Sequence, residues 1–137
     1  MKSDKSKIVH SGKRKTAVAR AVIIEGTGVI RLNKRDYQTL PFFDKLRIEE
    51  PIRIAKEILG SINFDVLITV HGGGQKGQIE AARIALSRAI IDFTKSKELK
   101  EAYLTYDRGL LVADVRRKEA YKPGDSKARS RRQKSYR

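Results

Sequence analysis

Residues 64–77 read FDVLITVHGGGQKG, and this stretch decides the fold that we predict. Its first part, residues 64–70, is apolar and rich in β-branched side chains, which is typical of a strand. The strand runs almost directly into the glycines of residues 72–74, which can take the positive φ values that tight turns need. Beyond them, apolar residues recur along one face of a long helix that we expect over about residues 78–94.

The segments before this stretch predict a hairpin and a first helix. Residues 16–24 read as a strand, and the glycine-rich residues 26–28 make a turn. We therefore expect residues 29–32 to return as the second strand of a hairpin. Helical spacing of apolar residues predicts a helix over about residues 49–59, with Pro51 in its first turn, where a missing N–H costs little.

The segments after the long helix complete a mixed α and β pattern. Arg83 and Ser87 fall opposite the apolar face of the long helix, so we expect them to face outward. A short helix is expected over residues 96–106, and a last apolar segment over residues 109–113. The whole pattern predicts an α+β fold in two layers, in which a small mixed sheet packs on helices.

Charge is concentrated at the two ends of the 137-residue chain, whose formal net charge is +15. Residues 116–137 carry ten Lys or Arg against two acids, and residues 1–16 carry six against one. Residues 17–115, with 15 basic and 13 acidic side chains, are nearly neutral. A nearly neutral body with cationic ends is typical of a polyanion binder, because neutralising phosphates releases condensed counterions.

This charge pattern divides the chain into three parts. We predict a basic N-terminal arm over residues 1–15, a globular body over residues 16–114, and a basic C-terminal tail over residues 115–137. Both extensions are expected to be disordered until they bind, because they cannot bury enough apolar surface to offset the entropy of ordering.

The composition excludes several kinds of chemistry. The chain has no cysteine, which excludes a disulfide framework, a thiolate zinc site and a cysteine nucleophile. Its two histidines, His10 in the predicted arm and His71 at a strand end, do not make a metal site, so we expect no metal, no cofactor and no enzyme activity. The basic start is not followed by an apolar segment, so no signal peptide is expected, and no run approaches the roughly 20 apolar residues of a membrane span.

The glycines of residues 72–77 match the spacing of a dinucleotide fingerprint. They follow a strand and open a helix, where backbone N–H groups favour an anionic ligand. Asp92 has about the spacing of the acid that such a site needs, but it lies within the same predicted helix, and too little chain remains for further βαβ units. A plain strand-to-helix turn and an RNA phosphate held there beside Lys76 both remain open, with a nucleotide-binding enzyme as a less favoured hypothesis.

The basic segments have alternatives of their own. Residues 12–16, GKRKT, either form a solvated charge run or present cations at a sheet edge, and Arg20 is either ion-paired with a buried stem or contacts RNA. In the tail, Arg outnumbers Lys, and Tyr121 and Tyr136 offer rings for stacking on unpaired bases. These features favour specific RNA binding over a solubilising appendix. A protein that compacts DNA without sequence preference, suggested by the basic ends alone, remains a further hypothesis.

Five segments form a recognisable set: residues 12–20 (GKRKTAVAR), 26–33 (GTGVIRLN), 72–78 (GGGQKGQ) with the helix after them, 104–108 (LTYDR) and 133–137 (QKSYR). Together they resemble the universal small-subunit ribosomal protein nine family. The ending KSYR is similar to that of the archaeal and eukaryotic branch, and the short length favours an archaeal source.

The resemblance implies a body similar to the second domain of small-subunit ribosomal protein five, including a left-handed βαβ crossover. It also implies a cytoplasmic structural protein in the head of the small subunit, bound to ribosomal RNA (rRNA) and beside other ribosomal proteins. The tail would thread towards the peptidyl-site tRNA, where Arg137 would meet phosphates at the anticodon loop.

These arguments give two sets of candidate residues. The candidates for tRNA contact are Lys134, Ser135, Tyr136 and Arg137. The candidates for rRNA contact are Lys13, Arg14, Lys15, Arg20, Gln75, Lys76, Gln78, Arg116, Arg117, Lys118, Lys122, Lys127, Arg129, Arg131, Arg132 and Gln133.

Overall fold

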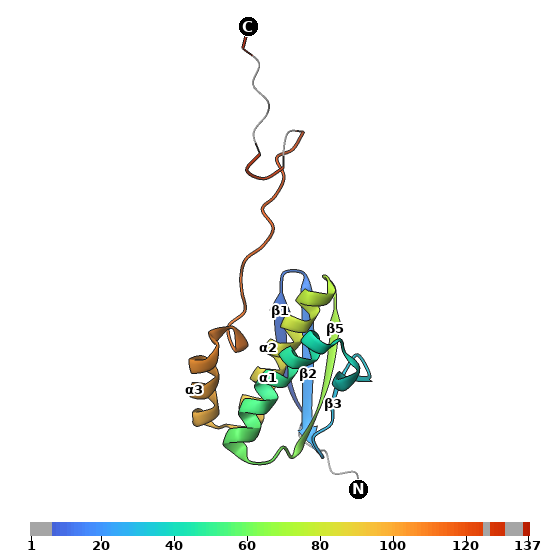
Figure 1. Cartoon of the computed structure of the whole chain (residues 1–137), viewed down its shortest axis with the longest axis vertical. Helices are drawn as coiled ribbons and strands as arrows, with labels where there is room; N and C mark the ends of the chain where they lie inside the picture. The colour runs from blue at the N-terminus through green and yellow to red at the C-terminus, as the bar shows by residue number, and fades with distance from the viewer. Residues whose placement is uncertain (1–6, 125–126, 131–135) are drawn as a thin grey trace.

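The computed structural model, which describes residues 7–124, 127–130 and 136–137, has a five-stranded mixed sheet with helices against one face (Figure 1). The strand order is β1-β2-β5-β3-β4, so the predicted α+β architecture is confirmed. The strands are β1 Ile8–Arg14, β2 Ala17–Glu25, β3 Ile30–Leu32, β4 Arg35–Asp36 and β5 Phe64–His71. The helices are α1 Phe42–Leu59, α2 Gln75–Thr94 and α3 Lys97–Tyr106, with short 3₁₀ turns at Tyr37–Thr39 and Arg108–Leu110.

Strand β1 corrects the expectation of a disordered arm over residues 1–15. Residues 8–14 pair antiparallel with β2, from Ile8 opposite Ile23 to Arg14 opposite Ala17. Gly12 lies directly on α2, and a Cβ there would overlap the carbonyl oxygen of Ala81. Side chains of β1 alternate between inward and outward positions, as in an edge strand packed on a helix. The basic residues around this strand concealed that alternation in the sequence.

The predicted hairpin of residues 16–32 is wrong, because β5 lies between its two strands. Strand β5 pairs antiparallel with β2 and parallel with β3, where Ile30 lies opposite Val66. Parallel neighbours need a crossover connection, and α1 provides it. The glycine turn serves this arrangement, since Asp65 Oδ1 accepts hydrogen bonds from the backbone N–H groups of Thr27, Gly28 and Val29, each at 2.9 Å.

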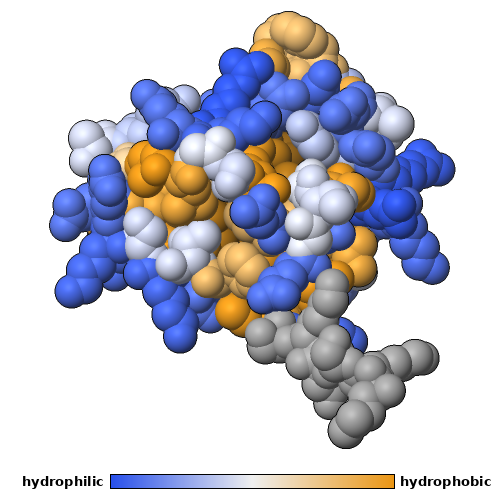
Figure 2. Space-filling model, turned by 90° about the horizontal axis from the view of Figure 1, so that it is seen from below, coloured by the Kyte–Doolittle hydropathy of each residue, from blue (hydrophilic) through white to orange (hydrophobic). Residues whose placement is uncertain are grey.

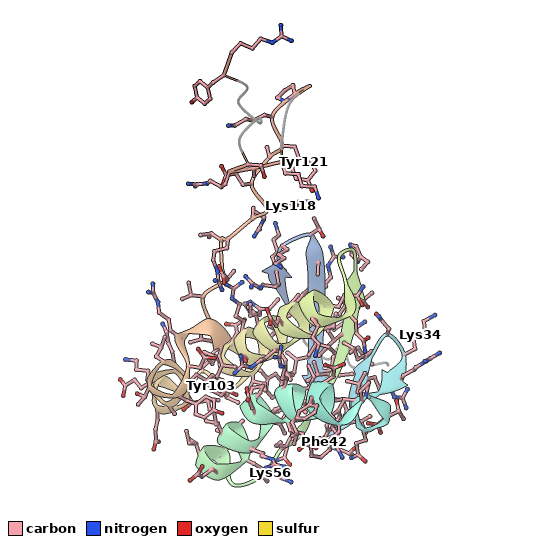
Figure 3. All side chains as sticks on the ribbon, turned by 45° about the horizontal axis from the view of Figure 1, so that its top comes forward. Lys34, Phe42, Lys56, Tyr103, Lys118 and Tyr121 are labelled. Carbon is pink, nitrogen blue, oxygen red and sulfur yellow. The ribbon has the colours of Figure 1, made fainter. Side chains whose placement is uncertain are left out.

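Helix α1 begins at Phe42, directly after Pro41, and is longer than predicted at its N-terminus. Pro51 consequently lies inside the helix and not in its first turn, as the sequence had suggested. It is buried, and its carbonyl oxygen accepts a 2.7 Å hydrogen bond from the hydroxyl of Tyr103 in α3. This bond ties the proline turn of α1 to α3 within the core; Tyr103 is labelled in Figure 3.

Helix α2 is covered on two sides, which corrects the predicted outward face. It packs against β1 and β2 on one side and against α1 on the other. Ser87 is fully buried, with its hydroxyl bonded to the carbonyl of Arg83, and Arg83 itself pairs with Glu50 and Asp107. The apolar periodicity of the helix showed one buried face but could not show the second.

The two faces of the sheet differ. Inward residues such as Ala21, Ile23 and Val66 are fully buried under the helices, whereas Leu67 and Thr69 on the other face are exposed. At the end of the body opposite the tail, apolar side chains gather within a surround of hydrophilic ones (Figure 2). No helix among the described residues is long and apolar enough to cross a membrane.

Candidate nucleic-acid interface

The fold brings the glycine-rich motif of residues 72–77 against the hairpin turn between β1 and β2, which Lys15 and Thr16 form. Gly72 and Gly73 take φ values of +78° and +63°. A Cβ on Gly72 would lie 2.6 Å from the carbonyl oxygen of Thr16, and one on Gly73 would lie 3.0 Å from the backbone nitrogen of Ala17. Both the conformation and the close approach therefore require glycine. Two motifs far apart in the sequence form one surface here.

Helix α2 starts in this surface with its first N–H groups uncapped by a side chain. Its N-cap residue is Gly74, its first turn contains no acid, and Lys76 is exposed. Such a helix start favours an anion, through its N–H groups and the helix dipole. The side-chain amides of Gln75 and Gln78, both predicted RNA contacts, are engaged within the protein: Gln75 donates to Asp44 at 3.0 Å, and Gln78 donates to the Gly72 carbonyl at 3.1 Å.

A cationic cleft lies beside the hairpin turn, where the tail leaves the body. It has a volume of about 530 Å³, and Lys15, at its hairpin side, takes a left-handed conformation with φ +53°. The cleft brings together five predicted rRNA contacts from segments a hundred residues apart, namely Arg14, Lys15, Arg116, Arg117 and Lys118. All five are cationic, so the cleft suits phosphate groups.

Asp114 joins the root of the tail to the hairpin. Its Oδ2 atom lies 2.6 Å from Arg14 Nη1 and 2.7 Å from Arg116 Nη2, and its Oδ1 atom accepts the backbone N–H of Arg116 at 2.9 Å. The hydrogen bonds from Arg116, with a smaller contribution from the charge of Arg14, hold the pKa of Asp114 well below its ordinary value. The Asp114 carboxylate is therefore ionised, and it holds Arg14 and Arg116 together where the tail leaves the body.

Glu80 in α2 is the second carboxylate that pairs with Arg14. Arg14 Nε lies 2.6 Å from Glu80 Oε2, and Arg47 of α1 lies 3.1 Å from Glu80 Oε1. Sequence reasoning missed both Glu80 and Asp114. The only signal for Asp114 was its position immediately before the basic tail, and Glu80 gave none, because its partners are distant in sequence.

The family of the chain follows from a comparison with known proteins. Residues 12–137 match the ribosomal protein S9/S16 family. The chain belongs to this family. The S9 resemblance inferred from the sequence motifs is thereby confirmed.

Similar S9 proteins come from methanogenic archaea, and each is called small ribosomal subunit protein uS9. The protein of Methanococcus vannielii is 53% identical over 135 residues, covering 96% of this chain and 99% of its own. Those of Methanococcus maripaludis strains C7 and C5 are 50% and 49% identical over the same shares. The S9 family is structural and non-enzymatic, so the hypothesis of a nucleotide-binding enzyme at the glycine loop is set aside.

Two further predicted contacts of this S9 chain lie on the open face of the sheet. Arg20 is exposed, and within the described part of the chain it has no ion pair, so it is not the buried, paired arginine of the alternative interpretation. Ser11 pairs with Arg20 across the strands, and Lys13 lies two residues further along β1. Lys13 and Arg20 therefore share this face, apart from the cleft.

The tail of the S9 chain rises from the body without a helix or strand among its described residues (Figures 1 and 3). Lys118 Nζ lies 4.4 Å from the ring centroid of Tyr121 and 2.8 Å from its hydroxyl. Arg129 pairs with Glu119 at 2.7 Å. Lys122, Lys127, Tyr136 and Arg137 are also exposed, whereas Arg131, Arg132, Gln133, Lys134 and Ser135 lie outside the described residues.

Proposed function

We propose that this S9-family chain is a structural constituent of the small ribosomal subunit that binds rRNA in the subunit head. The observation that carries the proposal is the cationic cleft. In it, Arg14 and Lys15 of the body meet the first three cations of the tail, Arg116, Arg117 and Lys118. Phosphate contacts fix where a protein sits on RNA, and this cleft sets the tail root and the body in one fixed relation. The start of α2 with Lys76, and the Lys13–Arg20 face, supply further cationic contacts.

The division of labour between body and tail is part of the proposal. The body holds Arg14 and Arg83 in ion pairs and fixes where the tail enters the RNA, and the tail supplies most phosphate contacts. Extended at about 3.3 Å per residue, residues 116–137 could span roughly 70 Å. That reach would bring Tyr136 and Arg137 to the anticodon region of the peptidyl-site tRNA, far from the body.

Sedimentation tests the placement in the small subunit. A native lysate is washed with high salt, separated on a sucrose gradient and probed for this chain. One copy per particle in the small-subunit peak is expected, because many phosphate contacts survive partial screening. Recovery at the top of the gradient, or together with DNA, would overturn the proposal.

A photocrosslinking residue tests the contact with tRNA. Benzoylphenylalanine replaces Tyr136 in one variant and Tyr121 in a matched control, and ribosomes are loaded with tRNA in the peptidyl site. Crosslinks to the tRNA anticodon arm are expected from position 136, and crosslinks to rRNA alone from position 121. Crosslinks only to rRNA from both positions would contradict the tRNA contact and leave rRNA binding intact.

A further inference from the structure

Another groove lies beside the edge strand β1, where α2 ends and α3 begins. It has a volume of about 470 Å³. The half-buried side chains of Ile91 and Leu111 contribute apolar surface to it, while Lys95, Lys97 and Lys100 are exposed around it. An apolar floor within a cationic rim suits a ligand that has both apolar groups and negative charge.

Some charged side chains of the groove have partners within the protein, and others have none among the described residues. Asp92, its one acidic lining residue, lies with Oδ2 3.0 Å from His10 Nε2, so that acid already has a partner. Arg88 is used internally, since it donates to the carbonyls of Leu111 and Ser11, each at 2.9 Å. The three lysines have no ion pair within the described residues.

Strand β1 offers backbone groups at the side of the same groove. It is the outermost strand of the sheet, and the carbonyl of Ser11 bonds Arg88 at that edge. Alternate residues of an antiparallel strand point their N–H and C=O groups the same way, so the backbone groups of Val9 point to this edge like the Ser11 carbonyl, which Arg88 already occupies. Exposed edges of this kind bind extended peptide segments by adding a strand.

We propose that this groove holds an extended acidic segment of a neighbouring ribosomal protein. Apolar side chains of that segment cover Ile91 and Leu111, its carboxylates meet the three lysines, and its backbone runs along β1. The inference rests on the placement of the chain in the small subunit, and it adds a partner class and a contact surface to it.

Two observations favour a protein segment over RNA. An RNA backbone would meet the lysines but would leave the apolar floor and the strand edge without partners. The groove also lies at the C-terminal end of α2, and it shares no lining residue with the cationic cleft beside the turn between β1 and β2.

Zero-length crosslinking tests the proposal on intact small subunits. A carbodiimide joins lysine amines to carboxylates only when they are in contact, and the products are mapped by mass spectrometry. Lys97 and Lys100 are expected to join Asp or Glu residues of one segment of one ribosomal protein. Lys56, exposed near the end of α1 and outside the groove, is the control and should not join that segment.

A charge reversal sharpens the test. Lys100→Glu should lower retention of that crosslinked protein in salt-washed subunits by more than about tenfold, because like charges across an interface cost more than one factor of ten in affinity. Lys56→Glu should leave retention unchanged, and melting temperatures of both variants check folding.

Three results would overturn the inference. Lysines that remain open to acetylation in intact subunits would show an empty groove. Ultraviolet crosslinks from residues 95–100 to rRNA would show that RNA occupies it. Equal retention of the partner by Lys100→Glu and Lys56→Glu would show that the groove is not its binding site. Absence of the chain from the small subunit would instead refute the proposed function itself.

Discussion

Arginines in the body and in the tail are used in opposite ways. Side chains of Arg14 and Arg83 are 15% and 16% exposed, and each pairs with two carboxylates from different elements of the fold. Side chains of Arg116 and Arg129 are 81% and 86% exposed, and each pairs with one acid near it in sequence, Asp114 for Arg116 and Glu119 for Arg129. Arg14 and Arg83 join separate elements of the body, whereas Arg116 and Arg129 are presented outward.

This difference limits what charge counting can show. Arg14 belongs to a basic run, yet two carboxylates take up most of its guanidinium. A cation that is held internally can line an RNA surface, but it adds less net charge to it than an unpaired one. An arginine side chain therefore stabilises the fold where it is ion-paired within the body, and it favours polyanion binding where it is exposed in the tail.

The largest expected effect on the free energy of unfolding comes from the packing of β1, the strand that carries Arg14, against α2. Gly12→Ala puts a Cβ against the backbone of Ala81 and Ala85, so β1 must move away from α2. We expect a decrease of about 3 kcal/mol in the free energy of unfolding, as for overpacked interiors. Gly74→Ala is the matched control, because a Cβ there has nothing within 4 Å. Denaturant unfolding measures both, and equal stabilities would contradict the close packing of β1.

Exchanging one arginine from each region tests the comparison directly. Arg83→Gln leaves Glu50 and Asp107 without their cation and should cost about 2 kcal/mol in the free energy of unfolding. Arg129→Gln should leave stability unchanged and weaken rRNA binding, because exposed pairs contribute little to folding. Unfolding curves and filter binding separate the two effects. A decrease in stability of similar size in both variants would remove the distinction.

The sequence predicted what local pattern can encode. Strand β5 and the glycine turn after it combine β-branched residues with a turn that only glycine can make, and both are confirmed. The helix of residues 96–106 is confirmed as well, with Ser96 capping it through a hydrogen bond to the N–H of Leu99. Each of these signals lies within a few residues of the element that it specifies.

Long-range pairing and second buried faces were not predictable in this way. The parallel partner of β3 is β5, more than thirty residues away, and nothing near residues 29–32 distinguishes it from β2. Ser87 is buried although the period of α2 places it opposite the apolar face, and α1 packs on this helix in addition to the sheet. At the candidate interface the cations were found by composition, but Asp114 and Glu80, which arrange them, became visible only in three dimensions.

The buried tyrosine gives a smaller effect on the body side. Tyr103→Phe removes the hydroxyl that bonds the Pro51 carbonyl and should cost about 1 kcal/mol. Burial raises the pKa of Tyr103 far above its ordinary value of 10.0, so the folded state keeps a proton that the unfolded state loses. Wild-type stability should therefore decline as the pH rises above about 10, and the decline should be weaker in Tyr103→Phe. Unfolding between pH 9 and about 11 measures it, and identical pH slopes would contradict the buried hydroxyl.

The smallest effect is expected at the junction of the two regions. Asp114→Asn keeps the size of the side chain and removes the charge that holds Arg14 and Arg116 together. Global stability should change little, since Arg116 is exposed, but the Arg116 amide should exchange its hydrogen faster because its acceptor is weaker. Hydrogen exchange observed by NMR reports this, with the Gly109 amide, bonded to Asp107, as the internal control. Unchanged exchange at Arg116 would mean that Asp114 does not anchor the tail.

The central claim is that the body folds without the tail, while the tail supplies most of the RNA contacts. The most direct measurement is the salt dependence of rRNA binding by the full chain and by a variant without residues 116–137, with circular dichroism of both. Removing ten cations should leave a folded body whose plot of log affinity against log salt concentration is shallower by about 0.7–0.9 for each phosphate that the tail had neutralised. An unfolded truncated chain, or a slope equal to that of the full chain, would contradict the account.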